Sequence, residues 1–238
     1  MQYKFQDATI IKIIEENESV KRFFIKVPDE IPFSFKAGQF IMLNLPINSK
    51  YTNRSYSIAS APGNDNIFEL CIVINPRGLG TPVMFSDFKP GTAIKISKAL
   101  GKFLLPETID RDICFICTGT GIAPFRSQLN DIFNNNIHHK NLFLVFGNRW
   151  EKDILYRNEM EQLADEHPEF TFIPVLSREN PDWKGRKGYI HNVYEELFTD
   201  KRPTYFYICG WAEMLKEARQ RLANMGYDKS AVKFESYD

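Results

Sequence analysis

The hydrophobic residues of the first hundred positions fall into short runs separated by turn residues. The runs with the length and composition of strands are Thr9–Glu15, Val20–Val27, Gln39–Leu45, Tyr56–Ala59, Phe68–Val73 and Ala93–Ser97. Proline and glycine stand between them, as in Ala37-Gly38 and Lys89-Pro90-Gly91. Many short strands joined by turns are typical of a barrel or a sandwich, and we predict an antiparallel β-barrel for residues 1–105.

The pattern changes near Leu105-Pro106, where apolar strands begin to alternate with amphipathic helical segments. The predicted strands are Ile113–Cys117, Asn141–Phe146, Thr171–Val175 and Tyr205–Cys209, followed by a last strand at Ala231–Tyr237. The predicted helices are Phe125–Phe133, Arg157–Glu166, His191–Phe198 and Met214–Met225. Strands that alternate with helices are typical of a doubly wound parallel sheet, which we predict for residues 106–238.

The length and charge of the chain limit the number of domains and the classes of partner that we expect. A chain of 238 residues suits two domains, and its 30 basic and 30 acidic residues cancel, so nothing in the overall charge suggests nucleic acid or an anionic membrane as a partner. No apolar run reaches the ~20 residues of a membrane-spanning helix. The first ten residues lack the apolar core of a signal peptide, so we expect a cytoplasmic protein.

Four cysteines are too few and too scattered for a disulfide framework. The spacing Cys114-x-x-Cys117 is one that zinc sites and redox pairs use. Both cysteines lie inside an apolar strand, however, where residues three apart point to opposite faces. We therefore interpret them as small buried hydrophobic residues, and we expect no metal site and no iron–sulfur cluster.

The segment from Asp112 to Arg126 is the richest in chemical information. An apolar strand ends at Thr118-Gly119-Thr120-Gly121, and a helical pattern begins near Pro124. A strand, a glycine turn and a helix present backbone N–H groups to a phosphate, which favours a nucleotide site. The alternative is an ordinary tight β–α turn, since the third glycine of the dinucleotide fingerprint is missing.

Further motifs accompany this turn along the chain. They are Arg54-Ser55-Tyr56-Ser57, Gly78-Leu79-Gly80-Thr81, Thr118 to Arg126, Ser177-Arg178 with Lys187-Gly188-Tyr189, Cys209-Gly210, and Glu235-Ser236-Tyr237. In type, order and spacing over nearly the whole chain, they resemble the motifs of the ferredoxin–NADP(H) reductase family. The resemblance implies an FAD-binding barrel followed by an NADP(H)-binding α/β domain.

For FAD, the resemblance implies a role for the first two motifs. Arg54 would pair with the pyrophosphate, Tyr56 would stack on the flavin ring, and Ser57 would hydrogen-bond the flavin N5 edge. The other residues assigned to FAD are Ser55, Cys71, Ile72, Gly78, Gly80 and Thr81. The alternatives are a surface salt bridge for Arg54 and an ordinary strand aromatic for Tyr56. Where the family often has a basic residue after its cysteine strand motif, residues 71–74 are wholly apolar.

For the pyridine nucleotide, the resemblance implies that Thr118, Gly119, Thr120 and Gly121 face the pyrophosphate, with Gly210 nearby. Ser177, Arg178, Lys187 and Tyr189 resemble the 2′-phosphate pocket of the family: a hydroxyl, two cations and an aromatic platform. No acidic residue suited to the ribose diol of NAD is evident there, so NADPH is expected over NADH. The alternative is a solvated basic loop made by Lys184, Arg186 and Lys187.

At the reaction centre, the resemblance implies Ser57, Cys209 and Glu235 around the nicotinamide, with Tyr237 over the flavin face. Hydride would pass from nicotinamide C4 to flavin N5, which requires stacked rings ~3–3.5 Å apart rather than a strong acid or nucleophile. The polar groups would orient the ring and carry a proton to or from the flavin edge.

Three functions fit this pattern. The first is a flavoenzyme that exchanges electrons between NADPH and ferredoxin or flavodoxin. An acidic ferredoxin would dock on basic residues, and the candidates are Lys21, Arg22, Lys50, Arg54, Lys98, Lys102 and Lys233. The second is the reductase component of an oxygenase, or an NAD(P)H-dependent flavin or ferric reductase. The third is a non-catalytic flavin- or nucleotide-binding subunit, which would not need Ser57, Cys209, Glu235 and Tyr237 together.

Overall fold

The protein is described by a computed structural model that covers residues 4–47, 50–178 and 181–237. The chain divides into two compact units, one of residues 1–105 with 123–137 and the other of residues 106–122 with 138–238. By this grouping residues 123–137 belong with the first unit, although the sequence places them inside the second domain, 106–238. The domain boundaries themselves stay a prediction.

The first unit is built on a six-stranded antiparallel sheet in the order β4-β3-β6-β1-β2-β5. The strands are β1 (Phe5–Asn17), β2 (Val20–Lys26), β3 (Phe40–Ile47), β4 (Lys50–Ser57), β5 (Ile67–Val73) and β6 (Ala93–Ser97). A bridge between Ile58, just after β4, and Leu70 of β5 joins the two edges of the sheet. The predicted antiparallel barrel is confirmed, and this bridge is where its two edges meet.

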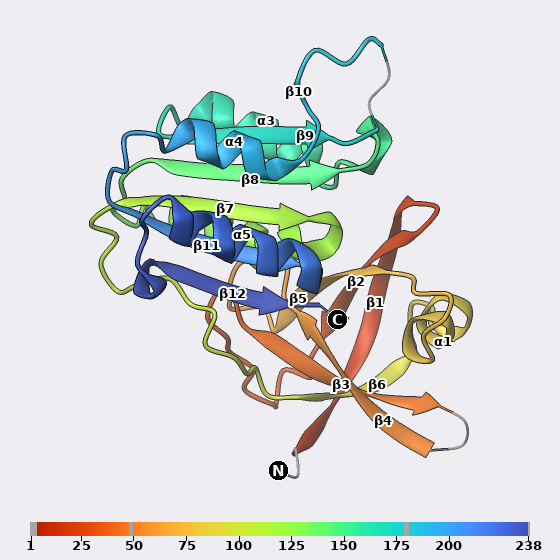
Figure 1. Ribbon diagram of the computed structural model, residues 1–238. Coiled ribbons are helices and arrows are strands. Elements are labelled where there is room, and N and C mark those ends of the chain that lie inside the picture. Colours follow the sequence, from red (N-terminus) through yellow and green to blue (C-terminus); the bar gives the residue numbers. More distant parts are fainter. Residues whose placement is uncertain (1–3, 48–49, 179–180, 238) are drawn as a thin grey trace. The chain divides into compact units, whose positions relative to one another are not determined.

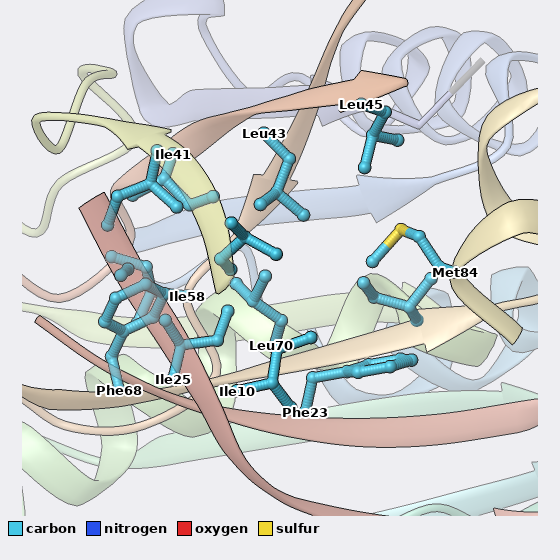
Figure 2. Packing of buried hydrophobic residues seen from close by; sticks show 14 of the residues in the cluster. Ile10, Phe23, Ile25, Ile41, Leu43, Leu45, Ile58, Phe68, Leu70 and Met84 are labelled. Carbon is cyan, nitrogen blue, oxygen red and sulfur yellow. The ribbon is translucent and has the colours of Figure 1, made fainter. Parts of the chain in front are cut away.

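The interior of the barrel is filled by alternate residues of its strands. On β3 these are Ile41, Leu43 and Leu45, because successive side chains of a strand point to opposite faces. Figure 2 shows this cluster and also Met84, which the helix α1 (Gly80–Asp87) adds to it. Burial of Met84 fixes α1 on the barrel, and with it the position of the helix N-terminus at Gly80.

Strand β4 differs from its prediction. The apolar run Tyr56–Ala59 suggested a strand, but β4 runs over Lys50–Ser57. Most of its residues are polar, so the hydrophobic pattern does not reveal it. Pairing with β3 along its whole length, from Ile47 with Lys50 to Phe40 with Ser57, makes it a strand. Strand β1 also starts earlier and ends later than predicted, because it pairs with both β2 and β6.

The second unit contains a six-stranded parallel sheet in the order β10-β9-β8-β7-β11-β12. The strands are β7 (Asp112–Thr118), β8 (Leu142–Asn148), β9 (Phe170–Leu176), β10 (Arg186–Lys187), β11 (Thr204–Gly210) and β12 (Val232–Ser236). The chain proceeds outward from β7 to β10 and then returns to the other side of β7 with β11. The strand order therefore reverses between β7 and β11, where ligands bind in sheets of this kind.

Helices cover the sheet of the second unit, as Figure 1 shows. They are α3 (Arg157–Glu166), α4 (Ile190–Leu197) and α5 (Ala212–Asn224), with short 3₁₀ segments η1 (Gly119–Ile122), η2 (Glu151–Asp153) and η3 (Lys229–Ala231). Apolar side chains of α4 and α5 pack with the strand residues Cys114, Ile116 and Phe206. The predicted doubly wound sheet is confirmed.

The two cysteines of the Cys114-x-x-Cys117 spacing are 0% exposed and form no disulfide. Burial raises the pKa of both thiols. The interpretation of these residues as small buried hydrophobic groups is confirmed.

Candidate functional site

The residues predicted to hold the FAD pyrophosphate meet beside the start of α1. Arg54 on β4 pairs in register with Leu43 of β3 and therefore lies on the face that carries the barrel core. A Cβ placed on Gly80 would lie 3.4 Å from Arg54 Cγ and 3.1 Å from Leu45 Cδ1. The guanidinium nitrogen Nε of Arg54 would lie 3.8 Å from the same Cβ, so the arginine side chain passes the N-terminal residue of a helix, and both groups favour negative charge.

The guanidinium of Arg54 has little to hold it within the part of the chain that the structure describes. Its Nη1 donates to the carbonyl of the neighbouring Asn53 at 2.8 Å, and no described carboxylate pairs with it. The surface salt bridge that was the alternative for Arg54 is absent from these residues. An exposed arginine beside a helix N-terminus fits the pyrophosphate of FAD.

Tyr56 lies two residues further along β4, on the same face as Arg54. It is half-buried and packs against the barrel core, opposite Ile41. Burial raises the pKa of Tyr56 to about 12, although the positive charge of Arg54 lowers it. The phenol therefore stays protonated and neutral under ordinary conditions. Ser55 and Ser57 project from the opposite face of the strand, where Ser57 is buried beside its partner Phe40.

The loop before α1 is shaped by its own hydrogen bonds. Thr81 Oγ1 accepts a hydrogen bond from Asn75 N at 2.8 Å, and Gly78 N donates to Asn75 O at 2.9 Å. The hydroxyl of Thr81 is therefore used inside the loop. Cys71 and Ile72 are buried on β5, with Ile72 in the barrel core.

In the second unit, the glycine turn lies on the end of strand β11. A Cβ on Gly121 would lie 2.4 Å from Cys209 O, and a Cβ on Gly210 would lie 2.6 Å from Thr118 Oγ1. Gly119 has φ +52° and Gly210 has φ +149°, which side chains disfavour. Only glycine permits this close approach, so the turn and the Cys209-Gly210 end of β11 meet at the point where the strand order reverses.

The hydroxyl group of Thr118 is buried and unsatisfied. Its Oγ1 makes no hydrogen bond within the described residues. Buried hydroxyls are nearly always satisfied by protein, water or ligand. An unsatisfied hydroxyl at the strand-order reversal fits a bound nucleotide.

Three of the four predicted reaction-centre residues lie together in this unit. Cys209 of β11 pairs in register with Glu235 of β12, and Tyr237 N donates to Gly210 O at 3.1 Å. The side chains of Tyr237 and Cys209 are hydrogen-bonded. Burial, assisted by the negative charge of Glu235, raises the pKa of the Cys209 thiol well above its ordinary value, so the thiol is neutral. Ser57 belongs to the first unit, and its place in this centre stays a prediction.

The predicted 2′-phosphate residues gather at the end of β9. Ser177 N and Arg178 N donate to Asn148 O at 3.0 Å and Arg149 O at 2.9 Å. Gly188 N donates to Leu176 O at 2.8 Å, which brings the segment of Lys187 and Tyr189 to the same end of the strand. The side chains of Arg178 and Lys187 are exposed, and that of Tyr189 is 75% exposed. The nearby Arg186 instead pairs with Glu196 at 2.8 Å.

Arg149 is a candidate that the sequence reasoning missed. It is exposed, follows the last residue of β8 and is bonded through its backbone to Arg178. The sequence feature that could have identified Arg149 is its position as a cation immediately after a buried strand, at the carboxyl edge where ligands of parallel sheets bind. It adds a third cation to the cluster of Arg178 and Lys187.

This architecture defines an oxidoreductase with one flavin domain and one nicotinamide-nucleotide domain. The family models described as "Oxidoreductase FAD-binding domain" and "Oxidoreductase NAD-binding domain" match residues 7–104 and 115–220. A curated relative, "Ferredoxin--NADP reductase B" of Sorangium cellulosum, is 30% identical over 240 residues, which are 98% of this chain and 97% of the relative. The chain belongs to the ferredoxin–NADP(H) reductase family, as its motifs predicted.

Other relatives share the fold but not always the length. The glycine betaine monooxygenase reductase subunit of Pseudomonas aeruginosa is 27% identical over 230 residues, and the chain spans 63% of its length. A solved ferredoxin NADP+ reductase from Neisseria gonorrhoeae, with bound FAD and NADP, has 26% identity and a TM-score of 0.85, and 99% of each chain is covered. The predicted cofactor, FAD, agrees with the matched flavin domain.

None of the helices within the described residues has both the length and the apolar character that a membrane crossing requires.

Proposed function

We propose that the protein transfers hydride between NADPH and its FAD and exchanges single electrons with ferredoxin or flavodoxin. The observation that carries this proposal is the group formed by Cys209, Glu235 and Tyr237 beside the unsatisfied hydroxyl of Thr118. A chain that only bound nucleotides would not need these groups together. When bound, FAD supplies the conversion between hydride and single electrons.

The residues of the chain have separate tasks in this proposal. Arg54 and the first turn of α1 hold the FAD pyrophosphate, and Tyr56 gives the flavin a neutral aromatic neighbour. The glycine turn holds the pyrophosphate of the nucleotide, and the protonated thiol of Cys209 adds no charge of its own to the centre. Glu235 is the carboxyl group of the centre and would accept or release the proton that accompanies hydride transfer.

The preference for NADPH over NADH rests on the three cations Arg149, Arg178 and Lys187. Their backbones are tied to the same strand ends, and their side chains are exposed. A doubly charged 2′-phosphate gains from several cations at once, whereas the ribose diol of NADH does not. Tyr189 is exposed and offers a flat surface for adenine.

The electron partner is proposed from the relatives and from surface charge. The name of the Sorangium relative supports ferredoxin, while that of the Pseudomonas subunit supports an oxygenase component as the second candidate. On the first unit Lys50, Lys98 and Lys102 are exposed and suit an acidic partner. Lys21 and Arg22 do not, since both are engaged by carboxylates, Lys21 by Glu15 and Arg22 by Glu16 and Glu69.

An anaerobic titration of the FAD-loaded protein with NADPH and then NADH tests the nucleotide part of the proposal. We expect substoichiometric NADPH to bleach the flavin absorbance, and NADH to do so poorly. The double variant R178A/K187A should lose the preference while NADH reduction stays unchanged, because only the 2′-phosphate contacts are removed. Equal reduction of the wild-type protein by both nucleotides would contradict the pocket, and no reduction by either would contradict the enzyme.

The partner is tested by cytochrome c reduction that depends on added ferredoxin. Docking between opposite charges weakens as salt screens them, so we expect the rate to fall between low and physiological ionic strength. The variant K98A/K102A should lower the rate through ferredoxin without changing flavin reduction by NADPH. A rate that is independent of salt, or activity only with an oxygenase component, would favour the second candidate.

A further inference from the structure

The helix that follows the nucleotide turn is held by polar contacts to the flavin-binding barrel. The turn segment η1 ends at Ile122, and α2 (Ala123–Asn134) begins at the next residue, so no linker separates them. By its contacts, α2 is part of the first unit. The first residue of α2 is therefore the direct continuation of the turn.

Consecutive side chains of α2 each donate to a main-chain carbonyl of the barrel unit. Arg126 Nη1 donates to Ala59 O at 2.9 Å, and Ser127 Oγ donates to Ser60 O at 2.6 Å. Gln128 Nε2 donates in the same way to Phe103 O at 2.7 Å. Ser127 and Gln128 are fully buried, so their polar groups would have no water as an alternative partner if these bonds were lost. Such directional bonds define the position of a helix more sharply than apolar packing does.

Glu69 joins Arg126 to the same segment of the barrel. This carboxylate on β5 is only 2% exposed and accepts from Arg126 Nη1 at 3.2 Å and from Arg22 at 2.5 and 2.9 Å. The backbone of Glu69 accepts from Ala59 N at 2.8 Å and donates to Ser60 Oγ at 3.0 Å. A buried carboxylate needs such partners, since an unpaired one is costly. Side chain and backbone of Glu69 thus hold both α2 and the carbonyls to which α2 binds.

We propose that Glu69 and Arg126 are positioning residues for hydride transfer, which hold the first turns of α2, the direct continuation of the nucleotide turn, on the flavin barrel. Both residues act through the position of α2 rather than on the reacting atoms. The inference rests on the proposed function, since it assigns these residues to the step in which the nicotinamide nucleotide reduces the flavin. A purely structural role would instead make Arg126 equivalent to Arg22, which shares the carboxylate but lies on β2.

The test compares Arg126→Ala with Arg22→Ala as the matched control, both as FAD-loaded proteins. Anaerobic stopped-flow measurement gives the rate constant of flavin reduction at saturating NADPH and the Kd for NADPH, and photoreduction reports on the flavin without a nucleotide. Misplacement of a reacting group by a fraction of an ångström to 1 Å costs up to about 100-fold in rate, so we expect Arg126→Ala to lose about 10-fold or more. Arg22→Ala should stay within about twofold although its melting temperature falls similarly, and photoreduction should be unchanged in both.

Conservative variants keep the proposal falsifiable if Arg126→Ala does not retain FAD. Arg126→Lys keeps the charge and should recover much of the rate, while Ser127→Ala and Glu69→Gln, which keep the shape of their sites, should each lose about threefold or more. The inference would be overturned if flavin reduction stayed within twofold of the wild-type rate in Arg126→Ala, or in both Ser127→Ala and Glu69→Gln. It would also be overturned if Arg22→Ala and Arg126→Ala lost the same fraction of that rate. A wild-type protein that neither NADPH nor NADH reduces would overturn the proposed function and the inference with it.

Discussion

Replacement of Gly121 by alanine tests whether the nucleotide turn must lie directly on strand β11. The added Cβ would lie 2.4 Å from the carbonyl oxygen of Cys209 and 2.9 Å from its carbon. Both atoms belong to the backbone of a buried strand, so neither can rotate away. To reach an ordinary contact, the turn must move from β11 by about 1 Å.

This displacement has a cost in stability and a larger one in rate. Overpacking of a buried site by one methyl group costs about 1–3 kcal/mol, and the rigid neighbour places Gly121→Ala in the upper half of that range. The φ of Gly121 lies outside the left-handed region, so no backbone strain is added. A shift of ~1 Å next to Cys209 should lower hydride transfer by up to about 100-fold.

Gly119→Ala is the matched control, because Gly119 lies in the same turn. Alanine there is strained by its backbone conformation, whereas alanine at position 121 is strained by a close contact. The φ of Gly119 is +52°, and a Cβ there would meet nothing within 4 Å. A left-handed alanine costs about 1–2 kcal/mol but moves no neighbour. Denaturant unfolding should show a loss for both variants, and anaerobic stopped-flow reduction by NADPH should be slowed much more in Gly121→Ala. A Gly121→Ala protein with wild-type stability and rate, or a Gly119→Ala protein that is the slower of the two, would refute this reasoning.

Three further predictions concern individual side chains. Arg54→Ala should weaken FAD binding by about 10- to 100-fold, which is the effect of losing a charge-assisted hydrogen bond, and Arg54→Lys should have an intermediate affinity. A fluorescence titration of the apoprotein with FAD measures these affinities, and an unchanged affinity would exclude Arg54 from the pyrophosphate site. Burial raises the pKa of Tyr56 to about 12 from an ordinary 10.0, so the folded state resists ionisation of this phenol. As pH rises from 10 to 12, the free energy of unfolding should therefore fall by about 2 kcal/mol more in wild type than in Tyr56→Phe. Free energies of unfolding that fall equally with pH in the two proteins would contradict this. Burial, with help from Arg221, lowers the pKa of His191 below 6.5, so wild type should lose stability as pH falls below 6.5, whereas His191→Gln should not show this loss in urea unfolding.

Much of the second domain follows from the sequence because its elements are local. The predicted helix Arg157–Glu166 coincides with α3, and the predicted strand Ile113–Cys117 lies inside β7. A buried strand needs a continuous apolar run and a surface helix needs a 3.6-residue period, and both are visible in one short window. The glycine turn after β7 is also visible in one short window, because its glycines directly follow the strand, although the backbone that Gly121 approaches belongs to the distant strand β11.

What depends on distant partners was decided by the tertiary structure alone. Polar strand β4 exists because β3 pairs with it, and its two faces, with Arg54 on one and Ser57 on the other, follow from that register. Arg149 joins the predicted 2′-phosphate residues through a backbone bond to Arg178, and Arg126 meets Glu69 from 57 residues away. A sequence pattern records which residues are apolar, charged or flexible within a turn or two of each other. Which charged group meets which other is set by how sheets and helices pack, and that information is distributed over the whole fold.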